Sequence, residues 1–313
     1  MIEVCREAGL AGNCLVTIAI GSQYEKEWRK FAAPSWLDYC NKHDLGLYVV
    51  VDDLIDQNHP KWKKATWQKL LIGAHMGRLF PQINNVCYLD TDILINSAAP
   101  SIFDYYDSQS YGLVSQINNL PMSLELVMRQ YVFLRHNYYS KKYPLDSVVF
   151  MPVPDQYEYS GLTPLNDSAC AGLILFNVDR CASQMELWFE KYDRKTASIT
   201  DGDQTHLNWE MINSGKVQWL PYEFQALWVY EMAWKYSFLY TKHQKNTALI
   251  KDCIEACLFS NYFLHFAGSW HESDMWLIND VFTNDTVLRM NNDFQKYRKQ
   301  LLTGAPAGMV KPE

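Results

Sequence analysis

The sequence lacks any long uninterrupted apolar run. Across its 313 residues, no apolar segment reaches the roughly 18 residues that suggest a membrane-spanning helix. The N-terminal segment, residues 1–21, carries Glu3 and Glu7 ahead of a short β-branched run, which is unlike the leader of a secreted protein. We therefore expect no membrane span, while peripheral contact with a membrane surface stays open.

The sequence also lacks an excess of positive charge and any Cys-x-x-Cys pair. With 28 Lys and Arg against 35 Asp and Glu, the formal net charge is −7, so the chain has no electrostatic footprint for the backbone of a nucleic acid. The eight cysteines are scattered, several of them in apolar segments where reduced thiols pack. These absences argue against a nucleic-acid partner and predict a cytoplasmic location. They indicate nothing about oligomeric state.

What the sequence does have is the composition of a folded domain, with 48% apolar and 20% charged residues. Runs rich in β-branched residues alternate with amphipathic segments, which is typical of an α/β fold with a mostly parallel sheet flanked by helices. The expected strands are 14–20, 45–51, 86–95, 111–117 and 169–178, and the expected helices are 24–40, broken at Pro34, 66–80 and 184–192. We expect a single domain over residues 1–300 and a loose C-terminal tail over 301–313.

Two carboxylates belong to one of these expected strands. Asp90 and Asp92, in the segment YLDTDILI, are two positions apart, so in a strand both side chains point to the same face. The carboxyl-terminal edge of an open parallel sheet is where such folds bind ligands. Oxygen ligands favour Mg²⁺ or Mn²⁺, and two carboxylates leave coordination positions free for phosphate oxygens. An isolated Asp-x-Asp is nevertheless usually a solvated strand end or turn.

The surrounding motifs strengthen the metal interpretation, because they resemble those of the family 8 glycosyltransferases, the glycogenin-like family. Residues 66–95 resemble its helix with a basic residue followed by a YLDxD strand. VTIAIGSQYEKEW resembles its first strand and turn, ITDGDQTHLN its acidic DQxxLN element, and LHFAGSW its late HxxG element. Together the motifs span residues 14 to 275, in the order of the family. Each motif is weak alone, and four in sequence are not.

The resemblance implies a GT-A fold, which is Rossmann-like, and transfer of a hexose from a UDP-sugar to a carbohydrate or other hydroxyl acceptor, with retention of configuration. Residues 14–117 would form the nucleotide-sugar-binding half, and 118–300 an elaborated half for the donor sugar and the acceptor. The resemblance further implies Mn²⁺, or Mg²⁺, bound by Asp90, Asp92 and His265.

The same resemblance assigns the remaining site residues. Asp203 and Gln204 would lie beside the transferring sugar, and Lys69 would contact the donor as a point charge, so these three would carry catalysis. Tyr24 would pack on the uracil ring. The other contacts to the nucleotide sugar would come from Ala19, Ile20, Lys69, Asp90, Thr91, Asp92, Gly268 and His271.

The sequence departs from the family pattern at two positions. His271 stands where the family usually has the lysine that reaches the leaving diphosphate, with Lys61, Lys63 and Lys64 as other sources of charge. Cys170 stands where an asparagine is usual, which leaves the identity of the donor sugar open; Asp167 is a second candidate for that role.

Two alternatives to an active glycosyltransferase remain. A sugar nucleotidylyltransferase would need a glycine-rich, basic loop after its first strand, and Gly21-Ser22-Gln23 has neither the glycines nor the arginine. A catalytically weak or inactive domain of the same fold, which binds a nucleotide or glycan without turnover, is the nearer alternative because of His271.

Overall fold

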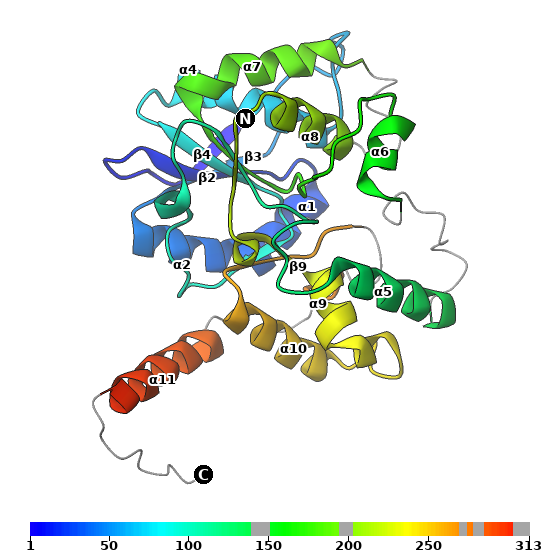
Figure 1. Cartoon of the computed structure of the whole chain (residues 1–313). Helices are drawn as coiled ribbons and strands as arrows, with labels where there is room; N and C mark the ends of the chain where they lie inside the picture. The colour runs from blue at the N-terminus through cyan, green and yellow to red at the C-terminus, as the bar shows by residue number, and fades with distance from the viewer. Residues whose placement is uncertain (139–150, 194–202, 269–273, 278–284, 303–313) are drawn as a thin grey trace.

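The computed structural model describes residues 1–138, 151–193, 203–268, 274–277 and 285–302 (Figure 1). Within these ranges the chain forms a large mixed sheet with helices on both faces, and a small second sheet. In spatial order the large sheet contains β1 (Ile2–Arg6), β3 (Gly46–Val50), β2 (Asn13–Ile18), β4 (Asn85–Leu89), β7 (Leu173–Asn177), β6 (Tyr111–Leu113) and β8 (Val217–Trp219). This confirms the expected α/β class.

The large sheet is mostly parallel. Strands β3, β2, β4, β6 and β8 run in one direction, whereas β1 and β7 pair antiparallel with their neighbours. In the pairing of β2 with β4, Val16 lies opposite Tyr88. The carboxyl ends of these two strands therefore meet at one edge of the sheet, where ligands bind in open α/β folds.

Alternating side chains bury the two faces of the sheet in separate cores. Leu15 and Cys87 belong to the core beneath α2, while Val16 and Tyr88 belong to the core beneath α4 and α7. Figure 1 shows α2 on one side of the sheet and α4 with α7 on the other. The α-helices are α1 (Ser22–Glu27), α2 (Ala33–His43), α3 (Ala65–Gln68), α4 (Ile72–Leu79), α5 (Leu124–Tyr138), α6 (Val153–Tyr159), α7 (Val178–Lys191), α8 (Gln204–Asn213), α9 (Trp228–Lys235), α10 (Thr247–Ser260) and α11 (Asp285–Leu302).

Short helical turns complete the description of these elements. They are the π-helical segment η1 (Trp28–Ala32) and the 3₁₀ segments η2 (Lys69–Leu71), η3 (Ile102–Tyr105), η6 (Tyr222–Gln225) and η7 (Ser237–Tyr240). None of the helices in the described part of the chain is long and apolar enough to cross a membrane.

The prediction that Pro34 breaks the helix over 24–40 is wrong. The segment is helical from Ser22 to His43, through α1, η1 and α2. Pro34 lies in the first turn of α2, directly after the π-helical segment. At this junction the hydrogen-bond pattern changes, since the N–H of Ala33 donates to the carbonyl of Trp28, five residues back. The missing N–H of Pro34 is accommodated there without ending the helical segment. The helix instead ends at Asp44, which adopts the left-handed conformation with φ of 53°.

The prediction of one strand over 86–95 is also wrong. The chain leaves the large sheet after Leu89, turns through residues 90–92, and enters the small sheet as β5 (Ile93–Ile95). There β5 pairs antiparallel with β10 (Phe263–His265), and β10 pairs parallel with β9 (Ala226–Leu227). Both strands are apolar because both are buried, and only the polar residues 90–92 separate them, so composition alone does not reveal the change of sheet.

Candidate metal and nucleotide-sugar site

Asp90 and Asp92 lie in the turn between the two sheets, each fixed by a backbone hydrogen bond to a different strand. The N–H of Asp90 donates to the carbonyl of Gly172, next to the start of β7, at 2.8 Å. The carbonyl of Asp92 accepts from the N–H of Phe266, next to the end of β10, at 3.0 Å. The expectation that both carboxylates point to one side holds, although a turn rather than a strand produces it.

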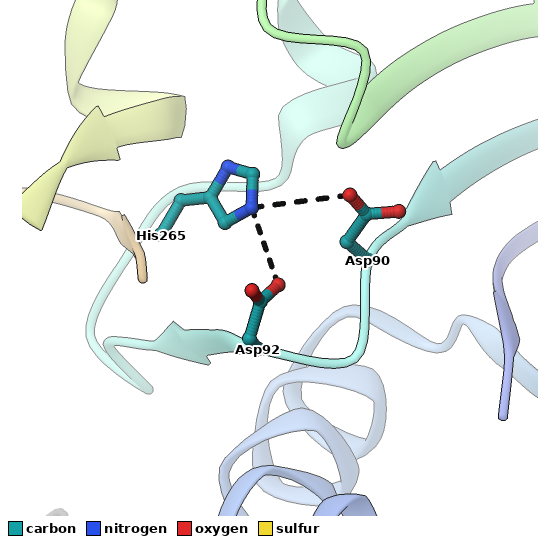
Figure 2. Close-up of side chains that lie close together, drawn as sticks. All are labelled: Asp90, Asp92 and His265. Carbon is teal, nitrogen blue, oxygen red and sulfur yellow. Dashed lines mark ion pairs between the residues drawn. The ribbon is translucent and has the colours of Figure 1, made fainter. Parts of the chain in front are cut away.

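His265 is brought to this turn by the register of the small sheet. As the last residue of β10 it lies opposite Ile93, directly after Asp92. Its Nε2 is 3.2 Å from Asp92 Oδ1 and 3.9 Å from Asp90 Oδ2. Figure 2 shows the imidazole and both carboxylates pointing toward one another. One ligand atom from each residue can be chosen so that all three lie within 4.8 Å of one another, a spacing that could hold a metal ion.

The electrostatics of this cluster are those of two half-buried carboxylates around a buried imidazole. Burial lowers the pKa of His265, but Cys170 and the Asp92 carboxylate outweigh it and hold the pKa well above its ordinary value. Burial conversely raises the pKa of Asp92, and His265 outweighs that effect, so the net direction is down. Asp92 Oδ1 is enclosed and makes no hydrogen bond of good geometry with any residue in the described ranges. Such an oxygen is available to a cation.

Lys69 lies beside the cluster and contacts two of the predicted carboxylates. Its side chain is 2% exposed, and Nζ is 2.9 Å from Asp203 Oδ2 and 3.8 Å from Asp90 Oδ1. The same ammonium donates to the carbonyl of Ala171 at 2.8 Å. Burial lowers the pKa of Lys69, but Asp203 and Asp90 outweigh it and raise the pKa. Burial raises the pKa of Asp203, and this effect is larger than the opposite effect of Lys69. We take Lys69 as charged, because two carboxylates face its ammonium group.

The N-terminus of α8 positions the two sugar-side residues of the prediction. Asp203 is the N-cap of this helix, and Gln204 is its first residue. Gln204 Oε1 lies 3.4 Å from the N–H of Ala171. One turn later Asn208, which is fully buried, donates to the carbonyl of Ala169 and accepts from its N–H, at 2.8 and 2.9 Å. The helix is thereby fastened to the segment that carries Ala171.

Gly172 is a site residue that the sequence interpretation did not identify. A Cβ at this position would lie 2.3 Å from His265 Cε1 and 2.8 Å from Asp90 Oδ2, closer than any side chain tolerates. Only glycine therefore lets the imidazole and the carboxylate approach each other here. Its occurrence in the Cys-Ala-Gly segment was the available signal.

The side chain of Cys170 faces His265. This side chain is 7% exposed, and its Sγ lies 3.5 Å from His265 Nδ1, on the side of the ring away from the carboxylates. Asp167, the second candidate for the role of the family's asparagine, accepts hydrogen bonds from Ser115 and Asn118 and thereby organises the loop after β6.

The residues expected to contact the nucleotide lie at the same edge of the large sheet. Ala19 is buried, and its N–H donates to the carbonyl of Val50, which prolongs the pairing of β2 with β3. Ile20 follows it, and Tyr24 is 61% exposed on α1, so its ring is open to a ligand. Thr91 is the middle residue of the turn over 90–92 and is half-buried.

The late HxxG element is described as far as Gly268. Gly268 has φ of 105°, a conformation that side chains with a Cβ rarely adopt, and it is exposed three residues after His265, the last residue of β10. His271 lies outside the described residues. Of the lysines considered in its stead, Lys63 is buried and donates to the carbonyls of Phe189 and Tyr192 at the end of α7. The ammonium group of Lys63 is therefore already hydrogen-bonded at the end of α7.

No family model and no curated protein sequence matches the chain. The solved structures that resemble it include a glycosyltransferase involved in the glycosylation of the major capsid of PBCV-1, at 11% identity and a TM-score of 0.47, covering 85% of this chain and 100% of that one. They also include the galactosyltransferase LgtC in complex with donor and acceptor sugar analogs, at 14% identity and a TM-score of 0.42, covering 96% and 97%. The glycosyltransferase GlyE of Streptococcus pneumoniae TIGR4 matches at 11% identity and a TM-score of 0.42, covering 91% and 64%.

These three proteins are glycosyltransferases, the class that the sequence motifs resemble. At such identities and TM-scores, the chemistry of the site has to be derived from its own residues. Two carboxylates and an imidazole converge at the ligand-binding edge of an α/β sheet, next to a buried ammonium and the N-terminus of a helix. Such an arrangement can bind a divalent cation and a diphosphate together.

Proposed function

We propose that this protein is a metal-dependent glycosyltransferase that moves a hexose from a UDP-sugar to a hydroxyl of a glycan or other acceptor, with retention of configuration. The observation that carries the proposal is the convergence of Asp90, Asp92 and His265 at one point of the sheet edge. The order of the four motifs along the chain supports the choice of donor and stereochemistry.

The donor atoms fit Mn²⁺, with Mg²⁺ as the second choice. A divalent cation would balance the charges of Asp90 and Asp92 and would engage the enclosed Oδ1 of Asp92. Two carboxylates leave coordination positions for diphosphate oxygens, and the imidazole of His265 favours Mn²⁺ over the harder Mg²⁺. Bound there, the ion would stabilise the negative charge that develops on the leaving diphosphate.

The chain's own residues would orient the donor sugar. Asp203 and Gln204, at the start of α8, would hydrogen-bond its hydroxyls, with Lys69 holding the Asp203 carboxylate in place. As the bond from the anomeric carbon to the phosphate oxygen breaks, its electrons leave with UDP, and the acceptor oxygen bonds to the carbon on the same face. We assign the acceptor's proton to the leaving phosphate, because Asp203 is engaged by Lys69.

The rest of the donor would extend along the edge of the large sheet. Tyr24 would stack on the uracil ring beside Ala19 and Ile20, and Gly268 would allow close backbone approach to the diphosphate. In this proposal residues 14–117 bind the nucleotide, and residues 118–300 supply the sugar and acceptor contacts.

A screen of UDP-sugars for Mn²⁺-dependent hydrolysis tests the proposal. We expect one UDP-sugar to be hydrolysed slowly with Mn²⁺, the activity to vanish with EDTA, and Asp92→Ala to abolish it. Turnover without metal, or full activity of Asp92→Ala, would contradict the assignment. Binding of UDP with Mn²⁺ but no release of sugar from any donor would instead identify an inactive binding domain.

A further inference from the structure

The second ring nitrogen of His265, Nδ1, faces away from the two carboxylates and is enclosed by two side chains. Gln225 Nε2 lies 3.2 Å from Nδ1, and Cys170 Sγ lies 3.5 Å from it. His265 and Gln225 are each 1% exposed. Because this side of the ring is closed to water, a proton on Nδ1 needs one of these two side chains as its hydrogen-bond acceptor.

Gln225 reaches His265 through the pairing of the small sheet. It is the last residue of η6 and directly precedes β9. Strand β9 runs parallel to β10, with Leu227 opposite His265. The pairing of β10 with β9 therefore also sets the distance between the His265 ring and the Gln225 amide.

One end of the Gln225 amide is unsatisfied. Its Oε1 is buried and has no hydrogen-bond partner among the described residues, while Nε2 faces His265 Nδ1. The two ends of an amide are nearly equal in size, so a half-turn of the group exchanges them in the same space. After that turn, Oε1 would accept a hydrogen bond from a proton on Nδ1.

We propose that Gln225 is a positioning residue for His265: its Oε1 holds the proton on Nδ1, so that Nε2 is the ring nitrogen that gives up its proton and offers its lone pair to a metal ion held with Asp90 and Asp92. A ring nitrogen binds a metal only through a free lone pair, and the hydrogen bond of the other nitrogen decides which one is free. A sulfur atom accepts only weakly, so Cys170 is no substitute. The inference rests on the proposed function, because the lone pair matters only if a metal ion binds.

The affinity for Mn²⁺, measured by calorimetry, tests this role without any turnover. Gln225→Met keeps the length of the side chain but removes the acceptor, and we expect it to weaken Mn²⁺ binding about 10–100-fold. Gln225→Glu keeps an acceptor oxygen and should bind Mn²⁺ nearly as wild type does. Cys170→Ala is the matched control on the other side of Nδ1 and should also stay close to wild type. Thermal unfolding of each variant shows that it is folded.

Long-range ¹H–¹⁵N spectra of histidine-labelled protein give a second readout, with diamagnetic Cd²⁺ in place of Mn²⁺. We expect the proton of His265 on Nδ1 in the wild type and in Gln225→Glu. If folded Gln225→Met binds Mn²⁺ as tightly as wild type, the role of Gln225 is wrong although the metal site stands. If Gln225→Glu binds Mn²⁺ as weakly as Gln225→Met, an acceptor oxygen at this position does not sustain metal binding, and the inference is again wrong. If the wild type binds no Mn²⁺, the proposed function itself fails.

Discussion

At the scale of single residues, the site depends on the absence of one side chain. Gly172 lets His265 and Asp90 approach each other, and any Cβ there would collide with both. The residue belongs to the segment Cys-Ala-Gly, and the sequence can point to this segment only through its likeness to a family motif. The collision itself arises between strands far apart along the chain, so no local pattern reveals it.

Gly172→Ala should therefore disrupt the metal site. The added methyl group must displace the imidazole or the carboxylate, so we expect Mn²⁺ affinity to fall at least about 10-fold, as measured by calorimetry. Gly77→Ala is the matched control, because its Cβ would meet only the tip of Val178, at 3.1 Å. Unchanged Mn²⁺ binding by Gly172→Ala would show that His265 and Asp90 are not both ligands.

Lys69 allows a second prediction at this scale. Lys69→Met would leave the buried carboxylate of Asp203 without its partner at 2.9 Å, which should cost about 3–5 kcal/mol of unfolding free energy. Urea denaturation measures this, and the double variant with Asp203→Asn should recover part of the loss.

The matched control for Lys69 is an exposed ion pair. Arg129 and Glu125 on α5 have side chains 75% and 72% exposed, so Arg129→Met should cost no more than about 0.5 kcal/mol. If Lys69→Met and Arg129→Met lose equal amounts of unfolding free energy, Lys69 does not offset a buried charge.

At the scale of elements, the sequence predicts most strands and helices of the first half, since buried strands and amphipathic helices differ in period. It fails where two elements meet. The run over 86–95 hides the change from β4 to β5, because both strands are apolar. Pro34 was taken for a helix break, since its place in a first turn depends on the π-helical segment before it. Gln225 was missed because its partner His265 is a neighbour only through β9 and β10.

The short helix α1 carries a prediction about the nucleotide. Tyr24 is 61% exposed, so Tyr24→Ala should leave stability nearly unchanged. If its ring stacks on uracil, the loss should weaken UDP binding by about 1–3 kcal/mol, measured by calorimetry with Mn²⁺ present. Tyr159→Ala, which removes a ring 63% exposed on α6, should leave UDP binding unchanged. If Tyr24→Ala and Tyr159→Ala bind UDP equally well, Tyr24 does not belong to the nucleotide site.

At the scale of the whole molecule, the candidate site joins two sheets. Asp90 follows a strand of the large sheet, His265 ends a strand of the small one, and Asp92 lies in the turn that connects the sheets (Figure 2). The sequence could indicate the ligand set through its motifs, but it could not show that a second sheet exists, because β5, β9 and β10 are two or three residues long.

A metal ion bound here would act as a cross-link between the sheets. Hydrogen exchange measured by mass spectrometry should therefore slow with Mn²⁺ in peptides covering 90–95 and 263–266, and recover with EDTA. Peptides covering the paired strands β1 and β3 should not respond. Protection spread evenly over the chain, or none in wild type with Mn²⁺ bound, would contradict the cross-link.

The register of β5 and β10 has a consequence for how this chain can change in length. His265 reaches the carboxylates because it is paired with Ile93. A one-residue slip would carry Leu264 or Phe266 into that position, with the side chain turned to the opposite face. Insertions or deletions in the loops between these two strands leave the pairing intact, whereas a single one within either strand would take the imidazole away from the carboxylates.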